Sequence, residues 1–384
     1  MKILSMDIGT GTQDIFLFDS RLDIENGLKM VLPSPTMMIY QKLRQATRQG
    51  LGVLLEGVTM GGGPNQWAAQ DHMKAGLPIF ATPDAARTFN DDLEVIRKMG
   101  IQVVSEDEAH RLPSSILRME MKDFDFGTIR RSFEGFGVSL NDLDAIAVAV
   151  FDHGEAPPDV SDRKFRFDYL DSRIREENRL SAFAYAAGQI PQFMTRMRAV
   201  VKSAKDIDVP LFVMDTAPAA VSGALLDSQV QEQVNKLVVN VGNFHALAFR
   251  MGVNGIEGVL EHHTGLLDCE KLDLLLKRLV DGTLTREEVF SDNGHGALIY
   301  ENNSTTKNPD EWKVVVTGPR RSLLYNSSWH PYFAVPFGDM MMAGCFGMLA
   351  ALADLRPDWR DILQASLQCK KKDGGNAAPW DIVK

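Results

Sequence analysis

The first residues with chemical potential form a short polar segment near the N-terminus. Asp7 lies at the end of an apolar run, and five candidate phosphate-binding residues follow it: Gly9, Thr10, Gly11, Thr12 and Gln13. A turn of glycine and threonine exposes backbone N–H groups and hydroxyls, which suit phosphate oxygens. A carboxylate at the end of the preceding strand can hold Mg²⁺ through water, because Mg²⁺ keeps much of its hydration shell. The segment therefore predicts a magnesium phosphate site, and an ordinary tight hairpin is the alternative.

A second segment further along the chain has the same pattern. When Asp7 is aligned with Asn240, Gly9 lies opposite Gly242, and an apolar run follows each glycine turn. This second turn adds four candidate nucleotide contacts: Asn240, Gly242, Asn243 and Phe244. The pair of segments predicts an internal duplication. Two unrelated hairpins would give the same pattern, because glycine is common in turns.

Histidines and carboxylates supply a third kind of candidate chemistry. The possible metal ligands are His153, His245, His262, His263 and His295, with Asp152, Glu261 and Asp292 close to them in the sequence. They could bind a metal if the fold brought them together. None of them has the i, i+4 spacing of a helical metal site, so surface or loop histidines are the alternative. The glycine-rich residues 60–64 predict either a substrate loop or a flexible turn.

Composition limits the classes of protein and partner. The chain has 384 residues, 45% of them hydrophobic and 24% charged, which predicts a globular protein of two or three domains. Its net charge of -10 argues against nucleic-acid and anionic-membrane partners. The only cysteines, Cys269, Cys345 and Cys369, are too widely spaced for a CxxC motif and suit a reducing compartment. We therefore expect a cytoplasmic protein whose partner is a small molecule or another protein.

The elements that would position these residues alternate between strands and helices. Apolar runs predict strands at residues 2–8, 15–19, 52–55, 145–151, 211–214, 236–241, 246–250 and 313–317. Most are continuously apolar, as in strands that are covered on both faces. Helices are predicted at residues 35–49, 83–99, 169–188, 192–205, 268–279 and 338–352. This mixture predicts an α/β fold.

With these elements in place, the segment from Asp7 to Asp14 resembles the first phosphate loop of the actin, Hsp70 and sugar-kinase superfamily of ATP-binding proteins. Four further segments resemble motifs of that superfamily in its order. They are residues 212–227 (first hinge helix), 238–246 (second phosphate loop), 314–322 (adenosine loop) and 338–352 (second hinge helix). The hinge segments carry small residues at three- and four-residue spacing, including Gly223 and Gly347, which would let two helices cross closely. Ordinary core helices are the alternative.

The resemblance implies a two-lobed, duplicated ribonuclease-H-like fold with ATP and Mg²⁺ in the cleft. It implies lobe I at residues 1–230, lobe II at 231–340, and a segment at 341–384 that returns to lobe I. It adds the adenosine contacts Thr317, Gly318 and Pro319. It also implies a catalytic role for Asp7, through metal-bound water, and for Asp152. The latter ends a strand that faces the cleft in this superfamily, although a strand-terminal Asp is also a common turn former.

Three residues depart from the superfamily pattern. Asn240 replaces a carboxylate and cannot act as a base, Pro319 replaces a glycine, and Asp14 stands where some members carry a lysine. Within the superfamily the chain is most similar to a prokaryotic family labelled pyruvate formate-lyase-activating protein. Activating enzymes of that kind use a CxxxCxxC iron–sulfur motif, which this sequence lacks.

The resemblance therefore implies an ATP-binding phosphotransferase or ATPase that acts on an unidentified small molecule or partner. Two alternatives stay open. The first is a nucleotide-binding regulator or activator with little turnover. The second is a metal-dependent hydrolase that uses the histidines and carboxylates.

Overall fold

The structure is a computed structural model that describes residues 1–300, 306, 308–368 and 380. The polar residues 291–308 predict a loop or an irregular hairpin, and part of this segment lies outside the described residues, as does most of the chain from Cys369 onward. Among the described residues, no helix is both long and apolar enough to span a bilayer.

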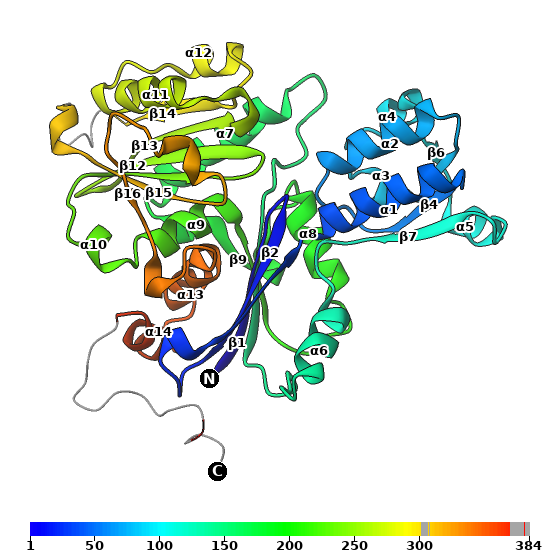
Figure 1. The fold of residues 1–384 in the computed structure, drawn as a ribbon, viewed down its shortest axis with the longest axis horizontal. Helices are drawn as coiled ribbons and strands as arrows, with labels where there is room; N and C mark the ends of the chain where they lie inside the picture. Colours follow the sequence, from blue (N-terminus) through cyan, green and yellow to red (C-terminus); the bar gives the residue numbers. More distant parts are fainter. Residues whose placement is uncertain (301–305, 307, 369–379, 381–384) are drawn as a thin grey trace.

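The first large sheet has an antiparallel meander followed by parallel strands. Its order is β3-β2-β1-β8-β10-β9 (Figure 1). The strands are β1 (Lys2–Ile8), β2 (Thr12–Asp19), β3 (Leu28–Pro33), β8 (Ala145–Val150), β9 (Ala184–Ala186) and β10 (Leu211–Asp215). Strand β8 pairs parallel to both β1 and β10, and β9 closes the edge in the antiparallel direction. We call this sheet with its helices lobe I.

The second large sheet repeats this arrangement. Its order is β14-β13-β12-β11-β15-β16, with β11, β12 and β13 as the meander and β15 parallel to β11. The strands are β11 (Lys236–Val241), β12 (His245–Gly252), β13 (Gly255–His263), β14 (Gly296–Ile299), β15 (Lys313–Thr317) and β16 (Tyr332–Phe333). We call this part lobe II. The two sheets confirm the predicted duplication and the two-lobed ribonuclease-H-like fold.

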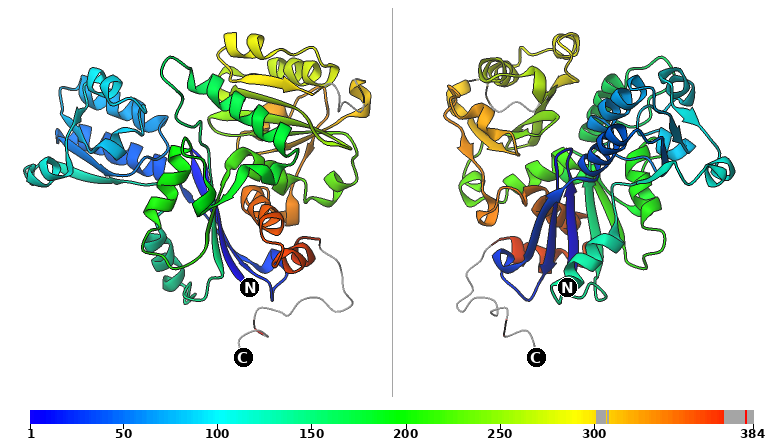
Figure 2. Two further views of the ribbon diagram at one scale, coloured as in Figure 1. Left: turned by 180° about the vertical axis from the view of Figure 1, so that it is seen from behind. Right: turned by 45° about the vertical axis from the view of Figure 1, so that its right-hand side comes forward.

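A third unit, not foreseen from the sequence, lies between β3 and β8. Its four strands form a parallel sheet in the order β6-β5-β4-β7: β4 (Val53–Gly57), β5 (Ile79–Ala81), β6 (Gln102–Val103) and β7 (Leu117–Met121). Its helices are α1 (Pro35–Gln49), α2 (Pro64–Lys74), α3 (Pro83–Ala86), α4 (Leu93–Met99) and α5 (Glu106–Arg111). The unit, blue to cyan in Figures 1 and 2, projects to one side of lobe I.

The remaining helices cover the two large sheets. They are α6 (Phe126–Gly135), α7 (Asp162–Glu176), α8 (Thr195–Ser203), α9 (Thr216–Ala224), α10 (Ser228–Gln231), α11 (Cys269–Asp281), α12 (Arg286–Ser291), α13 (Ala343–Leu355) and α14 (Arg360–Leu367). Side chains of α6, α7 and α8 share one core with lobe I, whereas α13 and α14 pack on the opposite face of its sheet.

Two helix predictions were wrong. The segment at 83–99 forms two short helices, α3 and α4, because Asp92 caps a new helix by accepting from the N–H of Glu94. The segment at 169–188 leaves the helix after Glu176 and then supplies the edge strand β9. The first segment is divided by a new helix cap at Asp92. The second leaves the helix because its later residues pair with β10 as an edge strand.

The sequence of β8 explains how a helix can lie so close to the sheet. Its residues alternate between alanine and larger aliphatic side chains, in the order AIAVAV. Because side chains of a strand alternate between faces, Ala145, Ala147 and Ala149 all lie on the face that α13 covers. The Ser5 hydroxyl of neighbouring β1 donates to the carbonyl of Cys345 in α13, at 2.9 Å.

Helices α9 and α13 cross with their backbones in contact, which confirms the close approach expected from their small residues. A Cβ added at Gly223 would overlap the carbonyl oxygen of Ala343, and one added at Gly347 would overlap that of Ala219. Neither obstacle is a flexible side-chain end, so the neighbouring backbone would have to shift.

We expect Gly347→Ala to lower the free energy of unfolding by at least ~2 kcal/mol, because the new methyl group meets a helix carbonyl. Urea unfolding, followed by circular dichroism, measures the effect. The matched control is Gly135→Ala in α6, where an added Cβ meets no atom. That variant should keep or gain stability, by up to ~1 kcal/mol. Equal behaviour of the two variants would contradict the backbone contact.

Candidate functional site

The two glycine turns face each other across one cavity between the lobes. The cavity encloses about 780 Å³ of space, which includes open solvent. Of the residues predicted to contact a nucleotide, the following line it: Gly9, Thr10, Thr12, Asn240, Gly242, Asn243, Phe244, Thr317, Gly318 and Pro319. Gly11 lies directly beneath the side chain of Asn243, so the two turns touch. Gln13 instead donates to the carbonyl of Pro33 at 3.0 Å.

The same hydrogen bond closes both turns. The N–H of Gly9 donates to the carbonyl of Thr12, and the N–H of Gly242 donates to the carbonyl of His245, each at 2.9 Å. A Cβ at Gly242 would come within 2.7 Å of that carbonyl oxygen, so a side chain does not fit there. The two turns are thus equivalent structures in the two lobes.

A pair of carboxyl groups lies at the floor of this cavity. Asp7 and Asp14 are cross-strand partners in β1 and β2, and both line the cavity. Loss of hydration raises the pKa of Asp7 to about 7, a change that the hydrogen bond from Thr216 opposes. Desolvation and then the charge of Asp7 raise the pKa of Asp14 to about 8. A divalent cation would relieve the repulsion between the two groups. From the sequence, Asp14 was noted only as standing where some members of the superfamily carry a lysine. Its pairing with Asp7 was not predicted.

A second cavity adjoins the first and lies against the inserted unit. It encloses about 1010 Å³ of space open to solvent and shares Thr10, Phe151, Arg196, Phe244 and His245 with the first. Its other walls are strongly polar and include Thr59, Arg87, Asn90, Asp91, Asp152, His153 and Asp162. The cleft therefore consists of two joined chambers.

The glycine-rich residues 60–64 form part of the second chamber. The N–H of Gly61 donates to Asp123 at 3.2 Å, and its carbonyl accepts from Asn65 at 2.8 Å and from Thr36 at 3.2 Å. These bonds fix the segment in place. The segment is therefore not a free turn, and its role as a substrate loop stays a prediction.

Arg196 lies where the two chambers join. Its Nε and Nη2 donate to the buried Asp123 at 2.7 and 3.1 Å, and its Nη1 donates to the carbonyl of Phe151 at 2.7 Å. These bonds orient a guanidinium that lines both chambers. Sequence analysis did not single out Arg196, because its partners are distant in the chain.

Two carboxyl groups of the second chamber are candidate bases. Asp152 is buried, and its two oxygens accept from the N–H groups of Gly154 and Met197, each at 2.9 Å. Burial raises its pKa, and these bonds oppose the change. Desolvation, followed by the charges of Asp162 and Glu155, raises the pKa of Asp91 to about 7. The sequence placed Asp91 within a helix and gave no sign of this environment. The catalytic role of Asp152 stays a prediction.

A buried arginine joins lobe I to lobe II behind the chambers. Arg166 of α7 donates to Asp215 at 2.6 Å, to Glu261 at 2.8 Å and to the carbonyl of Asp152 at 2.9 Å. All three charged side chains are inaccessible to solvent. The guanidinium also lies 3.9 Å from the ring centre of Phe151.

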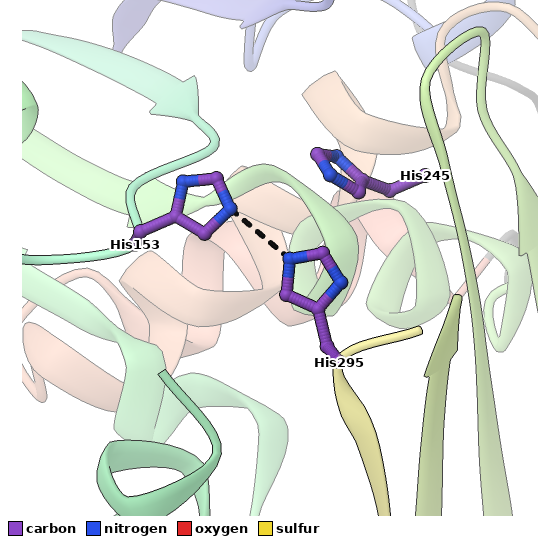
Figure 3. A group of neighbouring side chains, drawn as sticks. All are labelled: His153, His245 and His295. Atoms are coloured by element: carbon purple, nitrogen blue, oxygen red, sulfur yellow. Dashed lines mark hydrogen bonds between the residues drawn. The ribbon is translucent and has the colours of Figure 1, made fainter. Parts of the chain in front are cut away.

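Three of the histidines, His153, His245 and His295, lie close together (Figure 3). One ligand atom from each of His153, His245 and His295 lies within 4.8 Å of the others. The Nε2 atoms of His153 and His295 are 3.1 Å apart. The residues come from the loop after β8, the start of β12 and the residue before β14, respectively.

All three imidazoles are held in the neutral form. Desolvation, and then the charge of Arg166, lowers the pKa of His153 to about 3, and desolvation likewise lowers the pKa values of His245 and His295. His295 is buried, whereas His153 and His245 are half-buried, and His153 and His295 lie in loops, so the alternative of surface or loop histidines stays open alongside a metal site. Of the other two histidines, His263 lies beside the group, with its ring centre 4.8 Å from that of His295. His262 turns away and contacts Asp292 at 3.2 Å.

Comparison with protein families identifies this chain as a member of one of them. The model described as "Putative pyruvate format-lyase activating enzyme (DUF1786)" matches residues 60–323, and the chain belongs to that family. No protein of curated function matches the sequence.

Three solved structures illustrate a distant likeness. The activator of 2-hydroxyisocaproyl-CoA dehydratase from Clostridium difficile, with bound ADPNP, is 9% identical over 94% of this chain and 98% of its own, with a TM-score of 0.34. The inorganic polyphosphate/ATP-glucomannokinase from Arthrobacter sp. strain KM is 11% identical over 92% and 99%, also at 0.34. The ROK hexokinase from Thermus thermophilus is 12% identical over 93% and 100%, at 0.30.

The raised pKa values of Asp7 and Asp14 predict how stability depends on pH. The folded protein keeps protons that the unfolded chain loses above its carboxyl pKa of 3.8. Stability should therefore fall as the pH rises from about 5 to about 8, and Mg²⁺ should restore part of it. In Asp14→Asn the loss should be smaller by at least ~1 kcal/mol.

Urea unfolding at several pH values measures this dependence. Asp142→Asn is the control, because Asp142 is exposed and contacts Lys2 at the other end of β1. Its stability should change with pH as in the wild type. The same pH dependence in Asp14→Asn would show that the carboxyl pair does not hold these protons.

Proposed function

We propose that this protein binds ATP with Mg²⁺ in the first chamber and transfers the terminal phosphoryl group to an acceptor in the second. The observation that carries this proposal is the pair of equivalent glycine turns, one from each lobe, that meet across a chamber with two carboxyl groups at its floor. Phosphate oxygens need convergent N–H donors and a nearby cation. The two turns and the carboxyl pair supply both.

Each part of the nucleotide has a corresponding part of the chamber. The turn of β1 and β2 and the turn of β11 and β12 would hold the phosphates from both sides. Asp7, with Asp14 beside it, would bind water ligands of Mg²⁺. Thr317, Gly318 and Pro319 line the same chamber at the end of β15 and would contact the adenosine.

The junction of the chambers suits the transferring phosphoryl group. Phosphoryl transfer depends mainly on positioning and on stabilisation of charge on the equatorial oxygens. Arg196 lines both chambers and is held in one orientation by Asp123 and Phe151. Its guanidinium would stabilise that charge, and the polar walls of the second chamber favour a hydrophilic acceptor.

The description of the family names an activating enzyme, but this sequence does not suit the radical kind. Radical activating enzymes need closely spaced cysteines, and the three in this sequence are 76 and 24 residues apart. A nucleotide-dependent activator or regulator with little turnover is the second candidate. The observation that favours it is Asn240, an amide in the second turn that can orient water but cannot accept its proton. Basal ATP turnover separates the two candidates.

Isothermal titration calorimetry with ATP, in Mg²⁺ and in EDTA, tests nucleotide binding. We expect ATP to bind the wild type more tightly in Mg²⁺ than in EDTA. In Asp7→Asn the ratio of the two affinities should be at least ~10-fold smaller. The control Asp142→Asn should retain the wild-type ratio. If the wild type binds no ATP at millimolar concentration, the proposed function is wrong. If Mg²⁺ tightens ATP binding equally in Asp7→Asn and in the wild type, only the role of Asp7 is wrong.

Phosphate release tests the chemistry in the second chamber. We expect slow basal hydrolysis, because no carboxylate stands at Asn240. If Asp91 is the base, the rate rises with pH through about 7, since the base must be deprotonated, and Asp91→Asn removes that rise. If Asp152 is the base instead, Asp152→Asn should lower the rate by ~100-fold or more with nucleotide affinity kept. Fast hydrolysis that neither variant diminishes would contradict both assignments.

A further inference from the structure

We propose that His153, His245 and His295 bind a divalent transition-metal ion, with Zn²⁺ the best match, and that this ion joins the two lobes. The proposal does not depend on nucleotide binding. It rests on the three imidazoles shown in Figure 3 and on the unpartnered polar atoms around them.

The spacing of the nitrogens is close to that of a metal site. Two nitrogens bound at ~2.0–2.1 Å to a tetrahedral zinc ion lie roughly 3.3–3.4 Å apart. The Nε2 atoms of His153 and His295 are 3.1 Å apart, and a nitrogen of His245 lies within 4.8 Å of them. A small rotation of the His245 ring would complete a three-histidine site.

Several buried polar atoms here have no hydrogen-bond partner within the described part of the chain. Two of them, Nε2 of His245 and Oε1 of Glu261, have lone pairs that can bind a metal ion. Two others, Nδ1 of His295 and Nη2 of Arg166, cannot bind the same ion, because the former lies across the ring from the Nε2 that faces His153 and the latter is a cationic donor. An unpaired buried polar atom costs ~1–3 kcal/mol, so the two atoms with lone pairs favour a ligand at this place. The unpartnered Oε1 of Glu261 lies 3.6 Å from Nε2 of His295 and is available as a fourth ligand.

The donor set selects the kind of ion. Imidazole nitrogens suit Zn²⁺, Cu²⁺, Fe²⁺ and Ni²⁺, whereas Mg²⁺ prefers oxygen. The site is therefore chemically distinct from the carboxyl pair at Asp7. The nearby Arg166 carries a positive charge, but it is paired with two carboxylates, Asp215 and Glu261. The surroundings can thus accept a cation.

The three histidines come from both lobes, so an ion bound to them would connect the lobes. His153 follows β8 of lobe I, whereas His245 and His295 belong to lobe II. His245 lines both chambers and His153 lines the second. An ion held by these residues would bond the lobes together at the junction of the chambers. Three protein ligands leave a fourth position for Glu261, for water or for an oxygen of a bound acceptor.

Cobalt provides a spectroscopic test on the full-length, tag-free protein after treatment with EDTA and dialysis. Co²⁺ should give visible absorption of tetrahedral intensity at one equivalent per chain, and Zn²⁺ should displace it. In the double variant His153→Ala/His295→Ala the apparent Kd should rise by at least ~100-fold. The control is His262→Gln, because His262 is buried next to the site but contacts Asp292 instead.

Thermal unfolding gives a second measurement. Zn²⁺ should raise the Tm of the wild type and of His262→Gln, and should leave that of the double variant unchanged. If the double variant fails to fold, His153→Gln alone should weaken the cobalt signal. Absence of a stoichiometric site in the wild type, or binding that survives loss of His153 and His295, would overturn the proposal. Neither result would bear on ATP binding, which calorimetry measures separately.

Discussion

The buried guanidinium of Arg166 is the constraint on which the centre of the molecule depends. A charge without access to water is tolerated only when carboxylates and hydrogen bonds surround it, and removing one partner of such a group typically costs ~3–5 kcal/mol. Here the partners come from both lobes: Asp215 is the last residue of β10 in lobe I, and Glu261 lies in β13 of lobe II. Asp215 also accepts from the N–H of Ala217 and so caps α9. One side chain thereby sets the start of α9, the strand end at Asp152 and the distance between the lobes.

The two lobes share a topology but divide the chemistry unequally. The turn of lobe I stands beside Asp7 and Asp14, which suit a hard cation and its water. The turn of lobe II carries Asn240 and leads directly into His245, which suits a softer metal. The duplicated fold gives both lobes a similar backbone, and the side chains at equivalent positions determine which ligand each lobe can bind.

The parts of the structure that the sequence predicted are those with a local signal. An apolar run that meets a glycine turn is visible within a dozen residues, so both hairpins and their shared topology could be found. Small residues at helical spacing predicted the crossing of α9 and α13. The sequence predicted α1 and β4 of the inserted unit but not the unit itself, because its other strands, such as Gln102–Val103, are short and carry no motif. Arg166 and Arg196 were not predicted, because tertiary packing alone brings their partners together. The histidines were noted as possible metal ligands, but the sequence could not show which of them lie close to one another, for the same reason.

The contact between α9 and α13 restricts how the lobes can move. At Gly223 and Gly347 backbone meets backbone, with no side chains between that could change rotamer. Sliding one helix along the other would drive a Cβ or a carbonyl into its neighbour, whereas rotation about the crossing point keeps the contact. The packing therefore favours rotation about the crossing over sliding of the helices. A few degrees of rotation there would be amplified, as by a lever, into a much larger displacement at the outer rim of the cleft.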